Sequence, residues 1–375
     1  MQLENEFYKL PLSFDIEQLK REVLQFDESD WAPHHEHFEG NSAIPLISVG
    51  GEYNNEFKGE MKQTPALEAS PYIQQVIASF GEVIGRSRLM RLAPGSEVPL
   101  HCDINYHWHK RVRIHIPVVT EENVIFHCGE KKVHMAAGEC WIFDSWKHHK
   151  VINNSDCFRV HLVIDIIGSS RFWSMIRDRS TPSSSVVPPH TSNHFLAYSN
   201  EHIPQIKTEQ FNFPVIMTPS EIESLTNELH SQVVAFSPNE AKLSQEFIRI
   251  IKDFSLDWQE LWSQFGDKKE GWPFYHQLRQ RTLERASFFE KMVRVNEQTS
   301  AMKVLVHLII APSMSTELAE SALSVAIKPS VNSAEPKAEK HGAKSSTSTS
   351  TSTSRNSPCH CGSGEKYKHC HGKIN

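Results

Sequence analysis

The stretch PLHCDINYHWHKRVRIHIPV, residues 99–118, brings several histidines and one aspartate up to the start of an alternating pattern. From residue 112 to residue 118 every second position is apolar, and the positions between them hold Arg113, His115 and Pro117. Successive side chains of a β-strand point to opposite faces of a sheet. We therefore predict a strand here with one apolar face and one face that carries polar groups.

Short runs with the texture of β-strands continue on both sides of this stretch, from residue 88 to residue 167. Turn sequences such as APGS at 93–96 and NNSD at 153–156 separate them. Several short strands at close spacing, with turn residues between them, indicate a β-sandwich or a barrel. Two packing helices are predicted before them, over 70–81 and over 15–27, the latter with Asp15 as N-cap and with Ile16, Leu19, Val23 and Leu24 on one face.

His101 and Asp103 form a His-x-Asp pair shortly before the strand at 112–118. Residues two apart on a strand point to the same side, so both side chains can reach one ion. A third ligand is expected roughly 45 residues later, at His148 or His149, after enough chain for several strands to return to the same point. Two imidazoles and one carboxylate leave coordination positions open, as in non-haem Fe(II) oxygenases, so the pattern predicts a catalytic iron site.

An iron oxygenase also needs a source of electrons, and the commonest is 2-oxoglutarate, whose distal carboxylate requires a fixed bidentate cation. Arg159 meets this demand, because it follows His149 by ten residues and shares a predicted strand face with His161. Arg113 and His115 supply the same kind of polar face on the earlier strand.

The chain has 375 residues and a formal net charge of −6, from 39 basic and 45 acidic residues. This length accommodates two domains and a tail, and the charge balance gives no signal for nucleic acid or for an anionic membrane. The charged N-terminus has no apolar signal-peptide core, and seven cysteines suit reduced thiols plus a metal site. We expect a cytoplasmic, soluble protein. Because 22 histidines make chance metal patterns common, a second pair, His37-x-Glu39, counts for little without a matching downstream histidine and arginine.

The sequence changes character after the strand-rich region. Residues 171–217 are rich in Ser, Pro and Asn and are expected to connect two domains. Residues 218–327 are expected to form a helical domain that opens on a TPSE capping box and continues with an apolar stripe of Ile222, Leu225, Leu229 and Val233. Residues 328–356 read as a disordered, low-complexity linker.

The final segment, 357–375, holds Cys359, Cys361, Cys370 and His371 in a C-x-C-x8-C-H pattern. These four ligands are predicted to close a tetrahedron around Zn²⁺, and the metal would supply the folding energy that so short a segment lacks. A closed set of four ligands leaves no catalytic position, so a structural knuckle is expected.

Three quoted elements together resemble a known family: RLMRLAPGSEVPLHCD at 88–103, RVRIHIPVV at 111–119 and GECWIFDSWKHHKVINNSDCFRVHLVID at 138–165. In order and spacing they are similar to the aspartyl/asparaginyl β-hydroxylase family of Fe(II)/2-oxoglutarate dioxygenases. The resemblance implies an α+β fold for residues 1–170: a double-stranded β-helix, or cupin-like jelly roll, with packing helices.

The resemblance also implies roles for individual residues. His101 and His149 would bind iron, since HKVIN from His149 fits the H-x-V-x-N of the family, and Arg159, helped by Arg113 and His115, would hold 2-oxoglutarate. Animal members that act on secreted domains lack the carboxylate ligand, whereas Asp103 is in place here. This departure favours a conventional triad and weakens the transfer of a substrate.

The terminal segment is similar to the SEC-C zinc-binding motif, which implies a protein-docking module on a flexible tether. We expect the whole chain to hydroxylate an amino-acid side chain, Asp- or Asn-like, within a protein or peptide. Two alternatives remain open at this point: a free amino acid or small metabolite as substrate, and a non-catalytic metal-binding adaptor that acts through the SEC-C motif.

Overall fold

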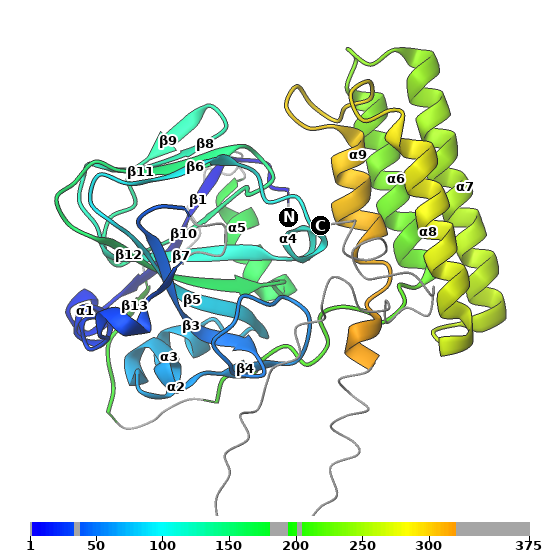
Figure 1. Cartoon of the computed structure of the whole chain (residues 1–375). Helices are drawn as coiled ribbons and strands as arrows, with labels where there is room; N and C mark the ends of the chain where they lie inside the picture. Colours follow the sequence, from blue (N-terminus) through cyan, green and yellow to red (C-terminus); the bar gives the residue numbers. More distant parts are fainter. Residues whose placement is uncertain (1, 34–37, 181–193, 201–204, 320–375) are drawn as a thin grey trace, which may run out of the picture. The chain divides into compact units, whose positions relative to one another are not determined.

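The computed structural model describes residues 2–33, 38–180, 194–200 and 205–319. They belong to two compact units that divide the chain between Asn212 and Phe213 (Figure 1). The described parts of the expected connecting segment up to residue 212, with helix α5 (Ser170–Ser180) and strand β13 (His194–Leu196), lie in the first unit. In the described ranges, every helix is too short or too polar to cross a bilayer.

The first unit is built on two β-sheets. The larger sheet has the order β13-β1-β10-β7-β12-β5-β3-β2, with β4 added to β3, and the smaller one has the order β6-β11-β8-β9. The remaining strands of the larger sheet are β1 (Phe7–Phe14), β2 (Ala32–Pro33), β3 (Asn41–Val49), β4 (Met61–Gln63), β5 (Ile84–Leu92), β7 (Val112–Val119), β10 (Glu139–Phe143) and β12 (Arg159–Ile166). Those of the smaller sheet are β6 (Glu97–His101), β8 (Val124–Cys128), β9 (Lys131–Val133) and β11 (His149–Asn153). Together the sheets form a double-stranded β-helix, which confirms the predicted fold class.

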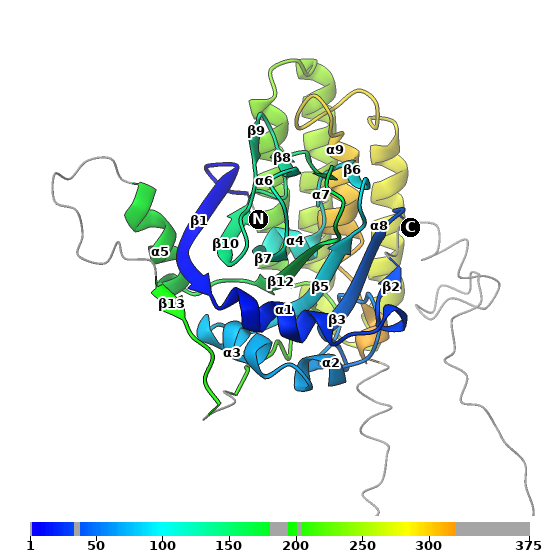
Figure 2. The same cartoon turned by 90° about the vertical axis from the view of Figure 1, so that its left-hand side faces the viewer.

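Three helices cover one face of the larger sheet: α1 (Ile16–Leu24), α2 (Pro65–Glu68) and α3 (Pro71–Ser79) (Figure 2). The main hydrophobic core lies between these helices and the sheet, and it includes the four apolar residues predicted for one face of β7, namely Val112, Ile114, Ile116 and Val118. The alternation in the sequence therefore assigned the two faces of β7 correctly. The polar face of β7 points to the interior between the sheets.

Helix α1 begins as predicted, because the Asp15 side chain accepts a hydrogen bond from the Gln18 N–H at 3.1 Å. Leu19 and Val23 are buried. Leu24, predicted for the same face, is 75% exposed, because it lies 100° further round the helix than Val23. The predicted apolar face of α1 therefore wrongly included Leu24.

Glu22 of α1 is buried and is tied to the start of α3. One carboxylate oxygen accepts from the Tyr72 N–H at 2.7 Å and the other accepts from the Ile73 N–H at 2.9 Å. Ser70, the residue before α3, makes no side-chain cap of its own. A carboxylate from a neighbouring helix therefore caps α3.

Residues 205–212 belong to the first unit and lie beside β4 and β5. Glu209 exchanges backbone hydrogen bonds with both strands: its N–H donates to Ile84 at 2.9 Å, and its carbonyl accepts from Met61 at 2.8 Å. Its carboxylate forms a bidentate ion pair with Arg111, at 2.7 and 2.8 Å. Both side chains are almost inaccessible, at 2% and 3% exposure, so this pair belongs to the interior.

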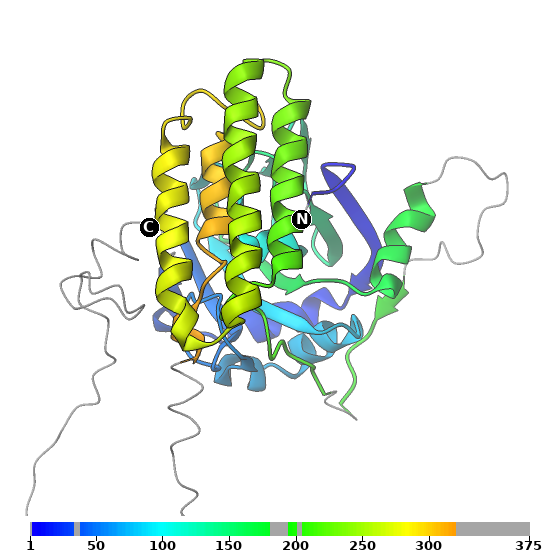
Figure 3. The same ribbon diagram turned by 90° about the vertical axis from the view of Figure 1, so that its right-hand side faces the viewer.

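The second unit is a bundle of α6 (Pro219–Ala235), α7 (Ala241–Phe265), α8 (Trp272–Ser287) and α9 (Ala301–Val304), the last continued by a π-helical turn at Leu305–Ile310 (Figure 3). The predicted stripe of α6, Ile222, Leu225, Leu229 and Val233, is buried. Thr218 is the N-cap with Pro219 at the first helical position, as predicted. The capping box itself is wrong, because the Thr218 side chain makes no cap hydrogen bond and its hydroxyl lies 3.3 Å from that of Ser220.

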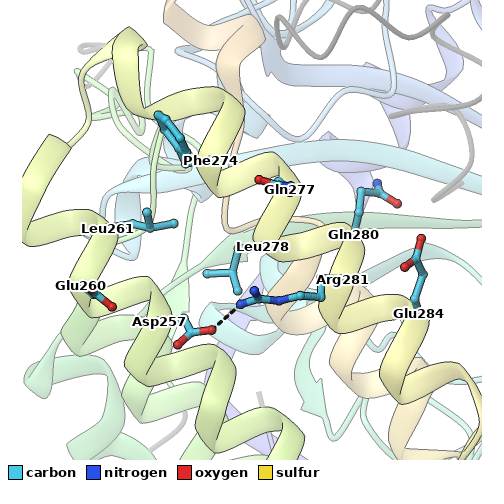
Figure 4. A pocket seen from close by; sticks show the side chains of 9 residues that line it. All are labelled: Asp257, Glu260, Leu261, Phe274, Gln277, Leu278, Gln280, Arg281 and Glu284. Atoms are coloured by element: carbon cyan, nitrogen blue, oxygen red, sulfur yellow. Dashed lines mark hydrogen bonds and ion pairs between the residues drawn. The ribbon is translucent and has the colours of Figure 1, made fainter.

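A solvent-open depression of about 1100 Å³ lies between α7 and α8 (Figure 4). Asp257 and Arg281 pair with each other across it. The other lining residues are Glu260, Leu261, Phe274, Gln277, Leu278, Gln280 and Glu284. Asp257 and Arg281 thus satisfy each other's charge.

Candidate metal centre

His101 and His149 face each other across the smaller sheet. Strands β6 and β11 are neighbours in the smaller sheet (Figure 1). His101 ends β6 and His149 begins β11, and the antiparallel register sets them directly opposite. Their ring centroids are 4.2 Å apart. The structure therefore joins two histidines that are far apart in the chain, and it selects His149 over His148 for this position.

Asp103 completes the group from the segment after β6. Its backbone N–H donates to the Ser145 carbonyl at 2.9 Å, which holds it beside the chain that leads to His149. Its carboxylate oxygens lie 3.8 Å from Nε2 of His101 and 3.9 Å from Nε2 of His149. Within the described ranges, these three residues are the single group of three or more potential ligands whose donor atoms all lie within 4.8 Å of one another.

The hydrogen bonds of the two imidazoles leave the correct nitrogen free for a metal. Nδ1 of His101 donates to the Pro99 carbonyl at 2.8 Å, and Nδ1 of His149 donates to the Lys147 carbonyl at 2.9 Å. A proton on Nδ1 leaves a lone pair on Nε2, the atom that faces Asp103 in both residues. Burial lowers the pKa of His149 to about 4, so its ring is neutral near pH 7. Two imidazoles and a carboxylate fit a divalent iron ion.

The interior face of β12 carries three polar side chains and one apolar side chain. Arg159 and His161 occupy one end of this face and Asp165 the other end, with Val163 between them. Arg159 is 4% exposed, and its Nη2 lies 3.3 Å from Nδ1 of His161. Burial lowers the pKa of Arg159 to about 9. A guanidinium this deeply buried is expected to meet an anion.

The Asp165 end of β12 is a cluster of cations around one carboxylate. Asp165 accepts from Nε of Arg113 at 2.9 Å and lies 3.8 Å from Nε of Arg86 and 3.3 Å from Nε2 of His107. Burial alone would raise the pKa of Asp165. The neighbouring Arg113 and His107 nevertheless hold this pKa well below its usual range. Arg88 of β5 lies opposite Val163, two residues before Asp165 on β12. Burial lowers the pKa of Arg88 to about 10.

The strand register separates two of the predicted co-substrate ligands. Arg113 of β7 lies opposite Asp165 of β12. Arg159 is the first residue of β12, six residues before Asp165. At about 3.3 Å per residue, their backbones are roughly 20 Å apart. His115 lies between them, opposite Val163. Arg159 therefore lies at one end of the interior and Arg113 at the other. At this separation we do not expect Arg113 and Arg159 to bind the same carboxylate.

Five interior residues were not among the predicted site residues, although His161 was predicted to share a strand face with Arg159: Arg86, Arg88, His107, His161 and Asp165. All are at most 3% exposed. The sequence shows that Arg88, His161 and Asp165 lie beside apolar residues in strands, where an unpaired charge is costly, but it does not show which groups they meet. The four predicted zinc ligands, Cys359, Cys361, Cys370 and His371, and the competing His37 lie outside the described residues.

A double-stranded β-helix that carries two imidazoles and a carboxylate on its smaller sheet is the construction of a non-haem iron oxygenase. The model of the aspartyl/asparaginyl beta-hydroxylase family matches residues 16–168, and that of the SEC-C motif matches residues 355–373. Both resemblances noted in the sequence are therefore confirmed. The domain at 16–168 is a hydroxylase of the 2-oxoglutarate–Fe(II) oxygenase class.

Solved structures with similar folds include an oxidoreductase of the 2OG-Fe(II) oxygenase family from Burkholderia pseudomallei, with 12% identity over 41% of this chain and 78% of the other, and a TM-score of 0.31. A prolyl hydroxylase from Trichoplax adhaerens, in complex with a hypoxia-inducible-factor peptide, has 14% identity over 48% and 88%, with a TM-score of 0.32. A prolyl-4-hydroxylase from Pseudomonas putida has 12% identity over 44% and 92%, with a TM-score of 0.30. A comparison with curated proteins found no match.

Proposed function

We propose that the first unit hydroxylates an Asp- or Asn-like side chain within a protein or peptide, with Fe(II) and 2-oxoglutarate as cofactor and co-substrate. One observation carries this proposal: the His101, Asp103 and His149 group lies in an interior that has a buried cation at each end. The two ends suit two anions of different molecules, and the three ligands suit the metal.

His101, Asp103 and His149 would hold the iron through two Nε2 atoms and one carboxylate oxygen, which leaves three positions for other ligands. Bound Fe(II) and 2-oxoglutarate supply the oxidising chemistry, in which O₂ is consumed, succinate and CO₂ are released and a C–H bond of the substrate becomes C–OH. The residues of the chain bind and orient the reactants. The Pro99 and Lys147 carbonyls keep both imidazoles turned toward the metal.

Arg159 is proposed to bind the distal carboxylate of 2-oxoglutarate. It is buried, and its Nε is without a hydrogen-bond partner in the part of the chain that the structure describes. An arginine with donors to spare in a buried interior is suited to a planar carboxylate.

The opposite end of the interior is proposed to receive the substrate. There Arg86, Arg88 and Arg113 are buried or nearly so, and Asp165 is the carboxylate that the described residues pair with Arg86 and Arg113. Arg88 donates to the side-chain oxygen of Asn55 at 2.8 Å, a neutral acceptor that a carboxylate can replace. An acidic or amide side chain would therefore satisfy the excess of donors.

The C-terminal SEC-C segment is proposed to bind Zn²⁺ through Cys359, Cys361, Cys370 and His371 and to dock a protein partner. The proposal rests on the motif match at 355–373 and on the donor set. A docked partner would raise the effective concentration of a protein substrate near the iron site.

The test supplies the full chain with Fe(II), 2-oxoglutarate and peptides that differ in one central residue, Asp, Asn or Leu. Succinate release and a mass gain of one oxygen are expected for the Asp and Asn peptides. His101→Ala should abolish both, because it removes a metal ligand; unchanged turnover in that variant rejects the metal assignment. Oxygen gain confined to the metabolite fraction of a lysate would favour a free amino acid or small metabolite.

A matched pair of arginine variants tests the substrate end. Arg88→Gln removes a buried cation, whereas Arg91→Gln, on the same strand, removes one that pairs with the exposed Glu28. Arg88→Gln should raise the KM for the Asp peptide about tenfold or more and leave the KM for 2-oxoglutarate unchanged. Equal effects of the two variants on the Asp peptide would contradict the assignment.

A further inference from the structure

His161 is a buried side chain of the interior that has no role in the metal centre or in the proposed substrate end. It is 1% exposed and lies between Arg159 and His115. Its Nδ1 lies 3.3 Å from Nη2 of Arg159 and 3.4 Å from Nδ1 of His115. The Nε2 atoms of both histidines are buried and have no partner among the residues that the structure describes.

The contact with Arg159 decides which nitrogen of His161 carries the proton. A guanidinium has donors and no acceptor, so Nδ1 of His161 has to be the acceptor. A neutral imidazole with an accepting Nδ1 carries its proton on Nε2. The Nε2–H of His161 is therefore a buried donor.

The contact between the two imidazoles then decides the tautomer of His115. Two facing nitrogens can share a hydrogen bond only if one of them carries a proton, and Nδ1 of His161 does not. His115 consequently donates through its own Nδ1–H, and shares the single lone pair of His161 Nδ1 with Arg159 in a three-centre hydrogen bond, which accords with the long distances of 3.3 and 3.4 Å. The Nε2 of His115 is then left with a lone pair. Burial lowers the pKa of both rings well below the usual value, so neither gains a second proton near neutral pH.

The two histidines thus present opposite chemistry to whatever binds between them. A carboxylate accepts hydrogen bonds and donates none, so it is attracted to the Nε2–H of His161 and repelled by the lone pair of His115. His161 is also next to Arg159, whose Nε is an unused donor within the described chain. His115 lies nearer the metal group, since its ring is 5.2 Å from Phe143, which in turn is 4.8 Å from His149.

We infer that His161, and not His115, is the imidazole that donates to the distal carboxylate of the co-substrate, beside Arg159, and that His115 accepts a hydrogen bond from an O–H or N–H group nearer the metal. This inference rests on the proposed use of 2-oxoglutarate. It assigns His161 as a positioning and binding residue and reverses the role expected for His115. Arg159 determines both tautomers, because its N–H donates to Nδ1 of His161, and this nitrogen can then only accept from His115.

The first test reads the tautomers directly, without turnover. Nitrogen-15 NMR of the full chain, labelled at histidine and loaded with diamagnetic Zn²⁺ in place of iron, should show His161 protonated at Nε2 and His115 at Nδ1. Addition of 2-oxoglutarate should shift the Nε2–H proton of His161 downfield. The opposite tautomers, or a shift confined to His115, would overturn the inference.

The second test measures 2-oxoglutarate affinity in matched variants by calorimetry on the same Zn²⁺-loaded chain. His161→Phe should weaken binding about ten- to a hundredfold, whereas His161→Gln, which places an amide N–H near the former Nε2, should recover most of the loss. His115→Asn, which keeps a donor near Nδ1 and removes the lone pair, should change the affinity less than about threefold.

The variants also separate this inference from the proposed function. A large loss in His115→Asn with none in His161→Phe would show that His115 is the donor, while 2-oxoglutarate would still be the co-substrate. A wild-type chain that neither binds 2-oxoglutarate nor releases succinate would instead reject the proposed function. The His161→Gln variant keeps the test valid if His161→Phe fails to fold.

Discussion

The side chain of Asn153, at the end of β11, makes five hydrogen bonds without touching the metal group. Its amide nitrogen donates to the carbonyls of Leu92, Ala93 and Cys157 at 2.9–3.1 Å, and its oxygen accepts from the N–H and the hydroxyl of Ser155 at 3.2 and 2.6 Å. The side chain is fully buried and so ties the strand that begins with His149 to the end of β5. The Asn of the H-x-V-x-N pattern is thus structural.

Asn153→Asp should therefore destabilise the first unit strongly. The substitution keeps the shape, but it sets a carboxylate oxygen against three carbonyl oxygens and leaves them without a donor, at about 1–3 kcal/mol for each lost partner. Asn154→Asp, at the exposed neighbouring position, is the control. Urea unfolding of both variants checks the expectation, and equal midpoints would contradict it.

At the scale of single residues, sequence and structure agree best where ligands follow a spacing rule. His101, Asp103 and His149 could be singled out because a short pair and a distant histidine are enough to define a triad, and the structure brings their donor atoms together. Arg86, Arg88 and Asp165 could not, since their roles depend on which strands become neighbours. The preference for His149 over His148 came from the family resemblance and could not have come from spacing alone.

At the scale of elements, α3 depends on α1 for its N-terminal cap. The first N–H groups of a helix have no partner within the helix, and the positive end of its dipole favours an anion. Glu22 supplies that anion from α1, through its two carboxylate oxygens. The cap thus fixes the two helices to each other as well as to the sheet.

Glu22→Gln should lower the free energy of unfolding by about 1–2 kcal/mol, because one oxygen becomes an NH₂ group that faces a backbone N–H. Glu17→Gln is the matched control on the same helix, where the side chain is 74% exposed. Thermal unfolding of the two variants provides the comparison. A larger effect of Glu17→Gln would show that the cap contributes little.

Strands were easier to predict in the middle of the larger sheet than at its margins. The runs at β5, β7, β10 and β12 were recognised, whereas β1 and β3 were not. Each of the two missed strands contains a proline, Pro11 or Pro45, and a proline argues against a central strand because it lacks an N–H. The structure accommodates both prolines at irregularities, since the register shifts after Leu10 in β1 and after Pro45 in β3.

At the scale of the whole molecule, the interior of the first unit holds buried, neutral histidines. Burial lowers the pKa of His107 to about 3 and that of His149 to about 4, and it holds the pKa values of His115 and His161 well below the usual value. In the unfolded chain all four would titrate near 6.5. Between that pH and about 4, the unfolded state therefore binds more protons than the folded state.

The free energy of unfolding should consequently fall as the pH drops below 6.5, by up to about 1.4 kcal/mol per pH unit for each buried histidine. Urea midpoints of the metal-free protein near pH 7, 6 and 5 measure the slope. His194→Gln, at an exposed position, is the control. A midpoint that is constant or higher at the lower pH would refute the expectation.

The fold class of the first unit followed from the sequence, but the end of that unit did not. The segment after residue 170 has no periodic pattern, so local reasoning assigned it to a connection. The structure of this segment depends on hydrogen bonds to residues far away in the sequence, such as Ile84 and Met61. The segment itself has no periodic pattern that would predict these partners.

The ion pair between Arg111 and Glu209 has a practical consequence for anyone who wishes to express the catalytic part alone. A fragment cut where the family match ends, at residue 168, would keep the guanidinium in the interior and discard its counter-charge. Leaving a buried charge unpaired costs about 3–5 kcal/mol, which approaches the whole stability of many domains. The boundary of recognisable homology is not the boundary of independent folding, and a usable fragment has to run to residue 212.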